Sequence, residues 1–554
     1  MSHRRVKVAV VGSGLAGLTT AYLLAAPQDD VDFEVHLFEK VRGQATGTRN
    51  SHDRNQAATL GMDSSSVSIP SPKHEGEWRI DVPMRSFQGG YYPHLIQLYR
   101  QLGVAFKTRD FTYSFSQTET PEAPLQTTLI YNGASGRDGV SMPAWLRDLP
   151  LRHKTYRVGL RIFTFLLFVL STLELFVCYL RLLIFVLPPL RSRRLQSQTF
   201  GEWVEETTPT NFLARWLAWD VSWQSFAQDV LVPLFSAVCT APEAAVKAHP
   251  AEDFLDYIWL TLGTHHYVVE HGVRDVVDRL SSRVRKVHLS AQIVGVHIDP
   301  SDPCLASIEC AGKHGTTSYT GFHHVVFATQ ATRASPMLSS YASSLASDPH
   351  ARHAIMAQIS ALEAFHYVRT VVINHTDASA ALLPTDIRDR RELNLVSCSP
   401  SPTPGHEEKW SPHRVPPSYT MATQILTPPS PSGTPTAPVF QTTNPFVPIS
   451  DDHILSVATL ERAVLTMPAK SALRSLCKSG PKRWYQCTAE VECTLGDLQG
   501  AGRLESDAHA GVWLVGSYAS TGIPLLEGCV VSAKNVYLGI CKSEGVHPCK
   551  ASRF

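Results

Sequence analysis

The chain has 554 residues, of which 44% are hydrophobic and 18% are charged, with 50 Lys and Arg residues against 49 Asp and Glu residues. These proportions are typical of a globular protein and exclude an intrinsically disordered one. The net charge of +1 supplies no basic surface to neutralise phosphates, which excludes a nucleic-acid partner. At about 150 residues per domain, this length predicts two to four domains.

The cysteines and the N-terminus indicate an intracellular protein. The 11 cysteines are odd in number and none lies in CxxC spacing, so we expect neither a disulfide framework nor a thiolate metal site. No histidines have HExxH spacing, and no metal is expected. The first apolar run contains Gly12, Gly14 and Gly17, unlike the apolar region of a signal peptide. We therefore expect no signal peptide and a reducing compartment.

The first 40 residues predict one complete β-α-β unit. Val6–Val11 is an apolar, β-branched run typical of a parallel strand that is buried on both faces. Gly14–Ala26 consists of small and apolar residues, and Pro27 ends this predicted helix. Phe33–Phe38 predicts the second strand, which ends at Glu39.

A GxGxxG motif lies between the first predicted strand and helix, where such a motif binds a dinucleotide pyrophosphate. The first glycine allows a tight turn, the second lets the backbone approach the pyrophosphate, and the third packs the helix on the strand. The phosphate charge then meets the helix N-terminus. Glu39, 22 residues after the last glycine, stands where an acid accepts hydrogen bonds from a ribose. The predicted dinucleotide-binding residues are Gly12, Ser13, Gly14, Leu15, Ala16, Gly17 and Glu39.

The remaining elements are less regular. Polar residues predict a loop insertion at 41–77, and two Pro/Ser-rich tracts predict another at 384–440. The spacing of Leu95, Leu98 and Leu102 indicates one face of a helix. Later in the chain we predict helices at Gly272–Leu280, Leu460–Cys477 and from Leu525 onward, with strands at Lys286–Ile298, His324–Ala328 and Val512–Tyr518.

One segment departs strongly from the average composition. From Ile162 to Leu187, 19 of 26 residues are Leu, Ile, Phe or Val. A helix of this length, at about 1.5 Å per residue, reaches across a bilayer core of about 30 Å. The apolar residues favour insertion by roughly 6–11 kcal/mol, against about 2.5–3.5 kcal/mol each for Glu174 and Arg181. Both flanks are basic, so the charges define no orientation.

The C-terminal segment narrows the choice of dinucleotide. Gly511–Ala533 reads as a strand that ends in glycine, followed by a Glu-Gly pair that opens a helix. In this arrangement the sequence resembles the flavin-containing amine oxidoreductase superfamily, which includes monoamine and polyamine oxidases, protoporphyrinogen oxidase and phytoene desaturases. The resemblance implies FAD as cofactor, with the positive end of the last helix dipole near the flavin. It adds Ile293 at the adenine and Gly516, Ser517, Glu527 and Gly528 to the predicted cofactor-binding residues.

The same resemblance implies the fold. We expect an α/β protein with a Rossmann-like FAD-binding domain built from discontinuous segments and an inserted α+β, largely helical substrate domain. The FAD-binding domain would comprise 1–90, 265–335 and 500–554. The substrate domain would comprise 91–264, with the apolar helical segment 162–187, and 336–499.

Three positions depart from the family pattern. The family usually has a second glycine pair with an arginine after the first acid; here Arg42-Gly43 precedes the insertion, and Leu60–Asp63 is the candidate for a displaced equivalent. Where many members have an acid that binds the ribityl chain, this chain has Ser517, whose neutral hydroxyl makes a weaker hydrogen bond. Cys529 follows the start of the last helix and is interpreted as a small buried residue rather than a covalent flavin link.

The resemblance also restricts the placement of the apolar segment. The N-terminal and C-terminal FAD motifs must lie in one compartment, whereas a single membrane crossing between them would separate them. Half of the segment, 13 residues, is too short for each arm of a two-span hairpin. We favour a monotopic helix on a membrane surface, with basic flanks at anionic headgroups. A helix pair buried in the substrate domain and a true span remain as alternatives.

The predicted function is an FAD-dependent oxidoreductase that oxidises or desaturates a hydrophobic small molecule by hydride transfer to flavin. No catalytic residue is assigned, because the protein's share in such a reaction is positioning and desolvation. One alternative is a soluble amine oxidase that releases hydrogen peroxide, in which Tyr518 would flank the flavin. Another is a non-catalytic, FAD-stabilised membrane-associated protein.

Overall fold

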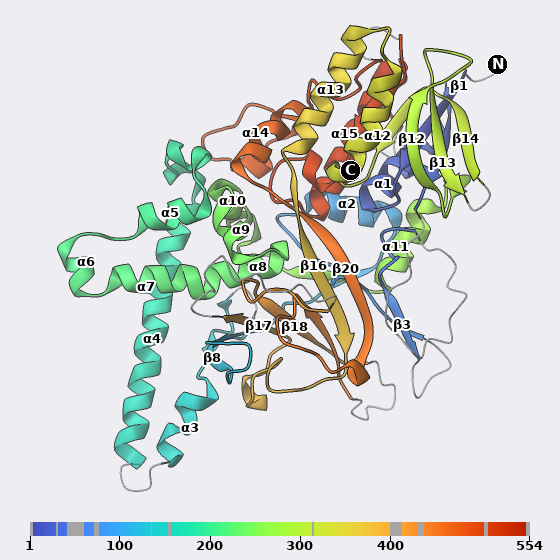
Figure 1. Ribbon diagram of the computed structural model, residues 1–554. Coiled ribbons are helices and arrows are strands. Elements are labelled where there is room, and N and C mark those ends of the chain that lie inside the picture. The colour runs from blue at the N-terminus through green and yellow to red at the C-terminus, as the bar shows by residue number, and fades with distance from the viewer. Residues whose placement is uncertain are drawn as a thin grey trace.

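The structure is a computed structural model. A five-stranded parallel sheet and an eight-stranded sheet organise the chain (Figure 1). The long strands β16 (His366–His375) and β20 (Ile454–Val464) run between the two regions (Figure 1). The described residues are 4–28, 31–40, 60–70, 77–133, 136–152, 157–312, 315–398, 413–428, 437–503, 508–549 and 554.

The parallel sheet confirms the predicted Rossmann-like fold. Its strand order is β11-β2-β1-β15-β23, and every neighbouring pair is parallel. The last four residues of β1 are buried, as expected for a strand covered on both faces. The strands are β1 (Arg4–Val11), β2 (Val31–Phe38), β11 (Lys286–His288), β15 (His324–Phe327) and β23 (Gly511–Leu514).

Two hydrophobic clusters cover the two faces of this sheet. One contains Val8 and Val10 of β1 together with residues of α1 (Leu15–Leu24) and α15 (Leu526–Ser543). The other contains Ala9 and Val11 with residues of α12 and α13. The remaining elements of these layers are α2 (Pro93–Leu102), α11 (Gly272–Ser281), α12 (Ala331–Ser344), α13 (Pro349–Glu363), β12 (Gln292–Ile298), β13 (Ala306–Gly312) and β14 (Gly315–Phe322).

The eight-stranded sheet corrects two of the sequence predictions. Its order is β20-β16-β19-β18-β17-β7-β8-β9. The predicted loop insertion at 384–440 contributes β17 (Leu393–Cys398) and β18 (Met421–Leu426), whose apolar runs lie between the Pro/Ser-rich tracts. The predicted helix from Leu460 was wrong in its first part, because these residues belong to β20, and α14 begins only at Met467. The other strands are β7 (Tyr113–Thr118), β8 (Gln126–Tyr131), β9 (Val140–Ser141) and β19 (Val439–Thr443), while α14 is Met467–Leu476.

The first predicted insertion, 41–77, is described only in part. Residues 41–59 and 71–76, including Arg42-Gly43, lie outside the described residues, as do 399–412 and 429–436 of the second insertion. In the first insertion, β3 (Val67–Pro70) pairs with β4 (Glu77–Ile80), which begins at the last residue of the insertion. A further three-stranded sheet consists of β5 (Ser86–Gln88), β10 (His266–Val269) and β6 (Phe106–Thr108).

A group of helices follows the apolar segment in the chain. An unbroken helical stretch runs from α7 (Trp219–Phe226) through a π-helical turn (Ala227–Leu231) into α8 (Val232–Cys239). π-helical turns inside α-helices are frequent at functional sites. The other helices are α5 (Phe200–Thr207), α6 (Phe212–Trp216), α9 (Glu243–Ala248) and α10 (Ala251–Thr261).

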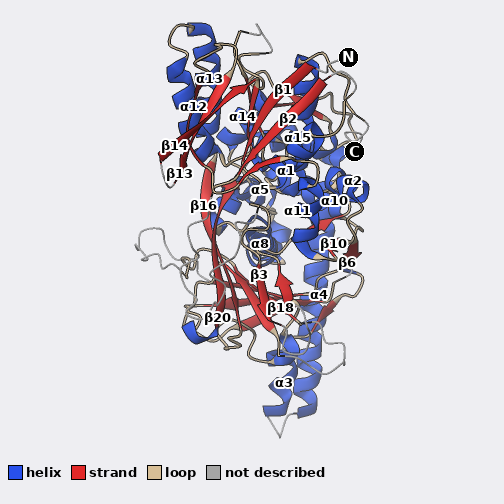
Figure 2. Cartoon of the chain, turned by 90° about the vertical axis from the view of Figure 1, so that its right-hand side faces the viewer, coloured by secondary structure: helices blue, strands red, loops and turns tan. Residues whose placement is uncertain are grey.

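The apolar segment forms one helix, α4 (Arg157–Val186), which projects from the molecule beside the short helix α3 (Ala144–Arg152) (Figure 1). Figure 2 shows α3 and α4 at the opposite end of the molecule from β1 and β2. The apolar side chains of α4 are mostly exposed; Leu170, for example, is 60% exposed. The alternative of a helix pair buried in the substrate domain was therefore wrong. By length and composition alone, Val158–Val186 is apolar enough to cross a membrane.

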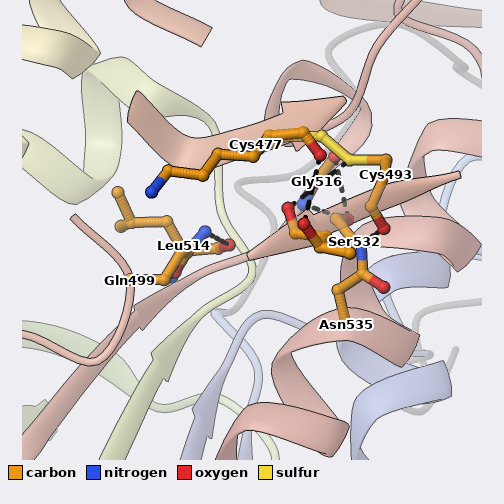
Figure 3. The surroundings of a disulfide bond; sticks show 9 residues. Cys477, Cys493, Gln499, Leu514, Gly516, Ser532 and Asn535 are labelled. Carbon is orange, nitrogen blue, oxygen red and sulfur yellow. Dashed lines mark hydrogen bonds between the residues drawn. A yellow bond between two sulfur atoms is a disulfide. The ribbon is translucent and has the colours of Figure 1, made fainter. Parts of the chain in front are cut away.

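One pair of cysteines is joined, although the cysteine spacing indicated no disulfide framework. Cys477 on β21 (Cys477–Ser479) forms a disulfide with Cys493 on β22 (Cys493–Leu495). Figure 3 shows this bond next to Asn535 of α15, whose amide donates to the Cys493 carbonyl oxygen at 2.7 Å. The 16-residue separation gives no spacing signal in the sequence, because the two short strands bring the thiols together.

Candidate functional site

A cavity of about 340 Å³ lies where the carboxyl edge of the parallel sheet meets the eight-stranded sheet. Ligands of open α/β sheets bind at this edge. Gly14, Leu15 and Ser517 line one side of the cavity. Leu395 of β17 and Gln441 of β19 line the other side. The cavity therefore connects the predicted dinucleotide motifs with the predicted substrate region.

The three glycines of the GxGxxG motif have distinct environments. Gly12 has φ +102°, and a Cβ there would lie 2.7 Å from the carbonyl oxygen of Ala328. A Cβ at Gly17 would overlap the Gly12 carbonyl oxygen, so a side chain would push α1 off the sheet. At Gly14, nothing lies within 4 Å of the position of a Cβ. Gly12 and Gly17 thus allow the tight packing of the turn against its surroundings, while Gly14 leaves open space at the N-terminus of α1. Ala16, in the first turn of α1, is buried.

Glu39 lies at the end of β2 and contacts the glycine-rich turn directly. Its Oε2 accepts a hydrogen bond from the Ser13 N–H at 3.0 Å and a short one from the Ser13 hydroxyl. The Ser13 Oγ in turn accepts the N–H of Gly61 at 2.6 Å. The predicted ribose-binding acid therefore also orders the turn that would hold the pyrophosphate.

The segment Leu60–Asp63 packs against this turn. The Met62 N–H donates to the Ser13 carbonyl oxygen at 3.2 Å, and both Gly61 and Met62 line the cavity. Asp63 is buried and forms an ion pair with Arg79 at 2.6 Å, which fixes the segment from behind. The displaced segment thus occupies a position beside the first glycine motif.

The C-terminal motif forms the adjoining wall of the cavity. After β23 the chain turns at Gly516, where a Cβ would lie 2.8 Å from the Tyr518 ring. Ser517 faces the cavity, and Gly528 allows the first turn of α15 to lie against it, since a Cβ there would lie 2.9 Å from the Ser517 carbonyl oxygen. The N-termini of α1 and α15 therefore lie at the same cavity, where their dipoles favour an anion.

Glu527 and Ile293 lie apart from the cavity surface. The Glu527 carboxylate accepts hydrogen bonds from the backbone N–H groups of His94 at 2.9 Å and Leu95 at 3.0 Å. It therefore caps α2, and its side chain is committed to that contact. Ile293 lies near the start of β12 and is partly buried against the second hydrophobic cluster. The nearby Ala291 N–H donates to the Glu39 carbonyl oxygen at 2.8 Å, which places this strand beside the predicted ribose acid.

Two arginines that the sequence reasoning missed also line the cavity. Arg85 and Arg462 each have a buried Nε atom without a hydrogen-bond partner. Burial lowers the pKa of both guanidinium groups, to about 10 for Arg462, which the charge of Arg85 lowers further. Cys529 lies near both, and its thiol faces the backbone N–H groups of Ser517 and Ala16. The arginines come from distant segments, so no motif spacing could have indicated them.

The part of the cavity beyond the arginines is apolar or neutral. Among the lining residues that the structure describes there is no Asp or Glu. Burial raises the pKa of the Cys239 thiol to about 12 and also raises the pKa of the Tyr257 hydroxyl, so both stay neutral at pH 7. The lining side chains of this part include Leu234, Val238, Val246, Leu393, Leu395, Ala422, Gln88, Gln424, Gln441, Thr443, Tyr113 and Tyr257.

These features fit FAD, which the resemblance implies. Open space at Gly14, two helix N-termini and two arginines with unsatisfied donors fit the pyrophosphate, since buried charges require partners of opposite sign. Ser517 and Cys529 lie between these features and the apolar part of the cavity. Within the described part of the chain, no group of three or more His, Cys, Asp or Glu residues is arranged to hold a metal ion.

Comparisons with known proteins agree with the N-terminal assignment. Residues 10–102 match the family model of an NAD(P)-binding Rossmann-like domain, so the prediction of a Rossmann-like unit is confirmed. No curated protein sequence matches this chain.

Several solved structures are similar along nearly the whole chain. A putative protoporphyrinogen oxidase from Exiguobacterium sp. 255-15 is 13% identical with a TM-score of 0.49, covering 98% of this chain and 99% of that chain. A cyclohexylamine oxidase from Brevibacterium oxydans IH-35A is 11% identical with a TM-score of 0.46, covering 98% and 99%. A putrescine oxidase bound to putrescine is 12% identical with a TM-score of 0.47, covering 98% and 100%.

Proposed function

We propose that this protein is an FAD-dependent oxidoreductase that oxidises or desaturates a hydrophobic, uncharged small molecule. The proposal rests on the continuous cavity, which begins at the open turn at Gly14. We call its apolar part, beyond the arginines, the chamber; no Asp or Glu occurs among its described lining residues. Bound FAD would supply the acceptor for a hydride, and oxygen or another acceptor would reoxidise it.

The residues of the chain would act by binding and positioning. The N-termini of α1 and α15 and the guanidinium groups of Arg85 and Arg462 would hold the anionic part of the cofactor. Ser517 would orient the ribityl chain through its hydroxyl. The aliphatic side chains of the chamber would exclude water and hold the substrate, with Gln424 and Gln441 as neutral hydrogen-bonding groups.

Anaerobic reduction of the purified protein tests this function. We expect the visible absorbance of oxidised flavin, which bleaches when a suitable hydrophobic substrate is added without oxygen. A panel of neutral isoprenoids and lipids should be compared with a panel of primary amines. A protein without bound flavin would contradict the proposal, and so would bleaching by small polar amines alone.

The alternative of a soluble amine oxidase has less support. A buried carboxylate would hold a protonated amine, and no Asp or Glu occurs among the described lining residues. Tyr518 is buried and packs 5.3 Å from the Phe365 ring, so it is not available as an aromatic partner for the substrate. Release of hydrogen peroxide with amines would favour this alternative.

A non-catalytic role makes a different prediction. A protein that uses FAD only for stability would bind flavin that no substrate reduces. Its thermal unfolding temperature would rise with FAD, as for any ligand that binds the folded state only. The anaerobic experiment therefore separates this role from catalysis.

We infer further that α4 attaches the protein to a membrane surface without crossing the bilayer. Both ends of α4 are tied to the same folded body. On the N-terminal side, the Ala144 N–H at the start of α3 donates to the Asp389 carboxylate at 2.9 Å. On the C-terminal side, Arg191 forms a buried ion pair with Asp256 of α10. A bilayer crossing would require these two attachments to lie on opposite sides of the membrane.

A further inference from the structure

We propose that α6 and the start of α7 form a second lipid-binding surface, which orients the substrate cavity toward the bilayer. This inference rests on the membrane attachment of α4 proposed above and adds a partner surface that the apolar segment does not contain. We call this surface the α6–α7 ribbon. It consists of the exposed residues Phe212, Leu213, Trp216, Leu217, Trp219 and Val221.

The ribbon exposes large apolar side chains from an ordered structure. Phe212 is 85% exposed and Trp216 is 74% exposed. Asn211 caps α6 by accepting the Ala214 N–H at 2.7 Å, and Trp223 of α7 is buried in the core. Large contiguous apolar patches on a protein surface mark binding sites, and Trp is favoured at the interface between lipid and water.

Arg181, one of the two charges within the apolar segment, joins α4 to α5 and to the buried part of α7, on either side of the ribbon in the chain. The Arg181 guanidinium lies 5.1 Å from the Phe185 ring and 5.3 Å from the Trp223 ring, and it donates to the Thr207 carbonyl oxygen at 2.6 Å. Its charge is therefore held within the protein, at the junction of α4, α5 and α7. In Figure 1, α6 and α7 extend across the upper end of α4. The two surfaces form one angled element that is fixed by this contact.

The distribution of apolar residues on α4 favours a bilayer as the partner rather than a second copy of the chain. At about 100° per residue, the exposed apolar side chains from Ile162 to Ile184 cover about two thirds of the helix circumference. A single partner helix covers a narrower face than this, whereas a helix that is embedded in one leaflet contacts lipid over a wide arc. The exposed Arg161 near one end of α4 adds positive charge that suits anionic headgroups.

The ribbon leads directly to the cavity. The unbroken helical stretch from α7 through the π-helical turn reaches α8, where Leu234, Ala237 and Val238 line the chamber. One end of this stretch is exposed in the ribbon and the other end forms the cavity wall. A bilayer that binds the ribbon would therefore lie at the outer end of a stretch whose inner end forms the chamber wall, on the side from which a lipid-soluble substrate would approach.

Vesicle binding by the full-length holoprotein tests the ribbon. We compare the wild type with a variant that carries Phe212→Ser, Leu213→Ser and Trp216→Ser, using vesicles of phosphatidylcholine alone or with phosphatidylserine. The variant should bind at least about tenfold more weakly in co-sedimentation, because three large apolar side chains no longer enter the lipid. As a matched control we use Met356→Ser, which removes a 46% exposed apolar side chain from α13, away from the ribbon, and should leave binding unchanged.

Further measurements keep the result interpretable. The thermal unfolding temperature and flavin content of the variant should equal those of the wild type, since the replaced side chains are exposed. If the variant is unstable, Trp216→Phe serves instead: brominated lipids should quench its tryptophan emission less than that of the wild type, with binding retained. Unchanged vesicle binding or unchanged quenching would overturn the proposal.

The oligomeric state and the flavin separate the remaining outcomes. A wild-type dimer that the triple substitution converts to a monomer, without vesicle binding by either, would assign the ribbon to a second copy and overturn the lipid proposal. Vesicle binding requires no turnover. Protein that binds vesicles through the ribbon but contains no flavin would therefore refute the proposed oxidoreductase and leave this inference intact.

Discussion

Helices α1 and α4 are both apolar, yet they have opposite environments. All ten residues of α1 are buried, whereas α4 exposes large side chains along most of its length. The difference lies in the size of the residues. Gly17 lets α1 lie directly on the sheet, since a side chain there would overlap the Gly12 carbonyl oxygen. In α4, Phe and Leu side chains point in most directions, and no single protein surface covers them.

This comparison shows that apolar composition indicates a need for a non-aqueous environment but does not identify that environment. For α1 the surroundings are the protein core, and for α4 we infer a bilayer. Buried positions are therefore sensitive to side-chain volume, and exposed apolar positions are sensitive to the solvent. Substitutions at the buried and the exposed positions of these helices should therefore have unequal effects.

Replacement of Gly17 by Val should abolish flavin binding and strongly destabilise the protein. The new side chain would overlap the Gly12 carbonyl oxygen, so α1 must move away from the sheet. Overpacking of this kind costs about 1–3 kcal/mol or more. The control is Gly159→Val in α4, where nothing lies within 4 Å of a Cβ and no loss is expected. Flavin absorbance and thermal unfolding measure both variants, and retention of flavin by Gly17→Val would contradict the assigned role of this turn.

Truncation of a buried leucine and of an exposed leucine in α4 should lower the free energy of unfolding by unequal amounts. Leu182 is only 1% exposed, and Leu182→Ala should lower the free energy of unfolding by about 2–5 kcal/mol. Leu170 is exposed, and Leu170→Ala should change it by less than about 0.5 kcal/mol in detergent-free buffer. Chemical denaturation measures both. Similar losses at the two positions would show that the exposed face of α4 is covered by protein.

Glu243 is a buried carboxyl group near the chamber, and its protonation should make the stability of the protein depend on pH. Burial raises the pKa of this carboxyl to about 7, and its Oε2 accepts a hydrogen bond from Gln228 at 3.1 Å. Between pH 4.5 and 7 the unfolded chain releases this proton while the folded chain retains it, so stability falls as pH rises through this window. Glu243→Gln should remove about 3 kcal/mol of that fall.

The Glu243→Gln test uses the difference between variant and wild type at each pH. This difference isolates Glu243 from groups that titrate in the same range, such as His249, whose pKa burial lowers to about 4. Above pH 7 the variant should stay more stable by a constant amount. A difference that does not change between pH 4.5 and 7 would contradict the raised pKa.

The cavity arginines should affect ligand binding more than folding. Arg462→Met or Arg85→Met removes a buried guanidinium whose Nε has no partner, so the protein without flavin should be as stable as the wild type or more stable. FAD affinity should fall by about 1.5 kcal/mol, close to tenfold in Kd, through loss of a charged hydrogen bond. Fluorescence titration with FAD measures this loss. Arg333→Met on the exposed surface of α12 is the control, and an equal loss there would refute the assignment.

The sequence predicted the N-terminal part of the fold well because its signals are local. The strand, turn and helix at Val6–Ala26 occur where the pattern placed them, and the glycine positions match the backbone geometry found at Gly12 and Gly17. In the C-terminal motif the helix begins one residue after its predicted start, whereas β23 ends at Leu514, before the predicted end at Tyr518. Such signals require only neighbouring residues, so a single sequence contains them.

Other features depend on contacts between distant segments and escaped prediction. Arg85 and Arg462 meet at the cavity only after folding, and the Glu527 carboxylate is used to cap α2. β17 and β18 lie among Pro/Ser-rich tracts that dominate the local composition. The apolar segment was recognised from the sequence, but only its exposure in the structure excluded burial in the substrate domain.

The buried ion pair of Arg191 and Asp256 links the C-terminal end of α4 to the helix that carries part of the chamber wall. Arg191 also donates to the Val186 carbonyl oxygen at 2.7 Å, so the same side chain binds both the last turn of α4 and Asp256 of α10. At about 1.5 Å per residue, the 30 residues of α4 extend about 45 Å from this ion pair. The residue after Asp256 is Tyr257, which lines the chamber. The residue that anchors the C-terminal end of α4 is therefore next in the chain to a side chain of the chamber wall.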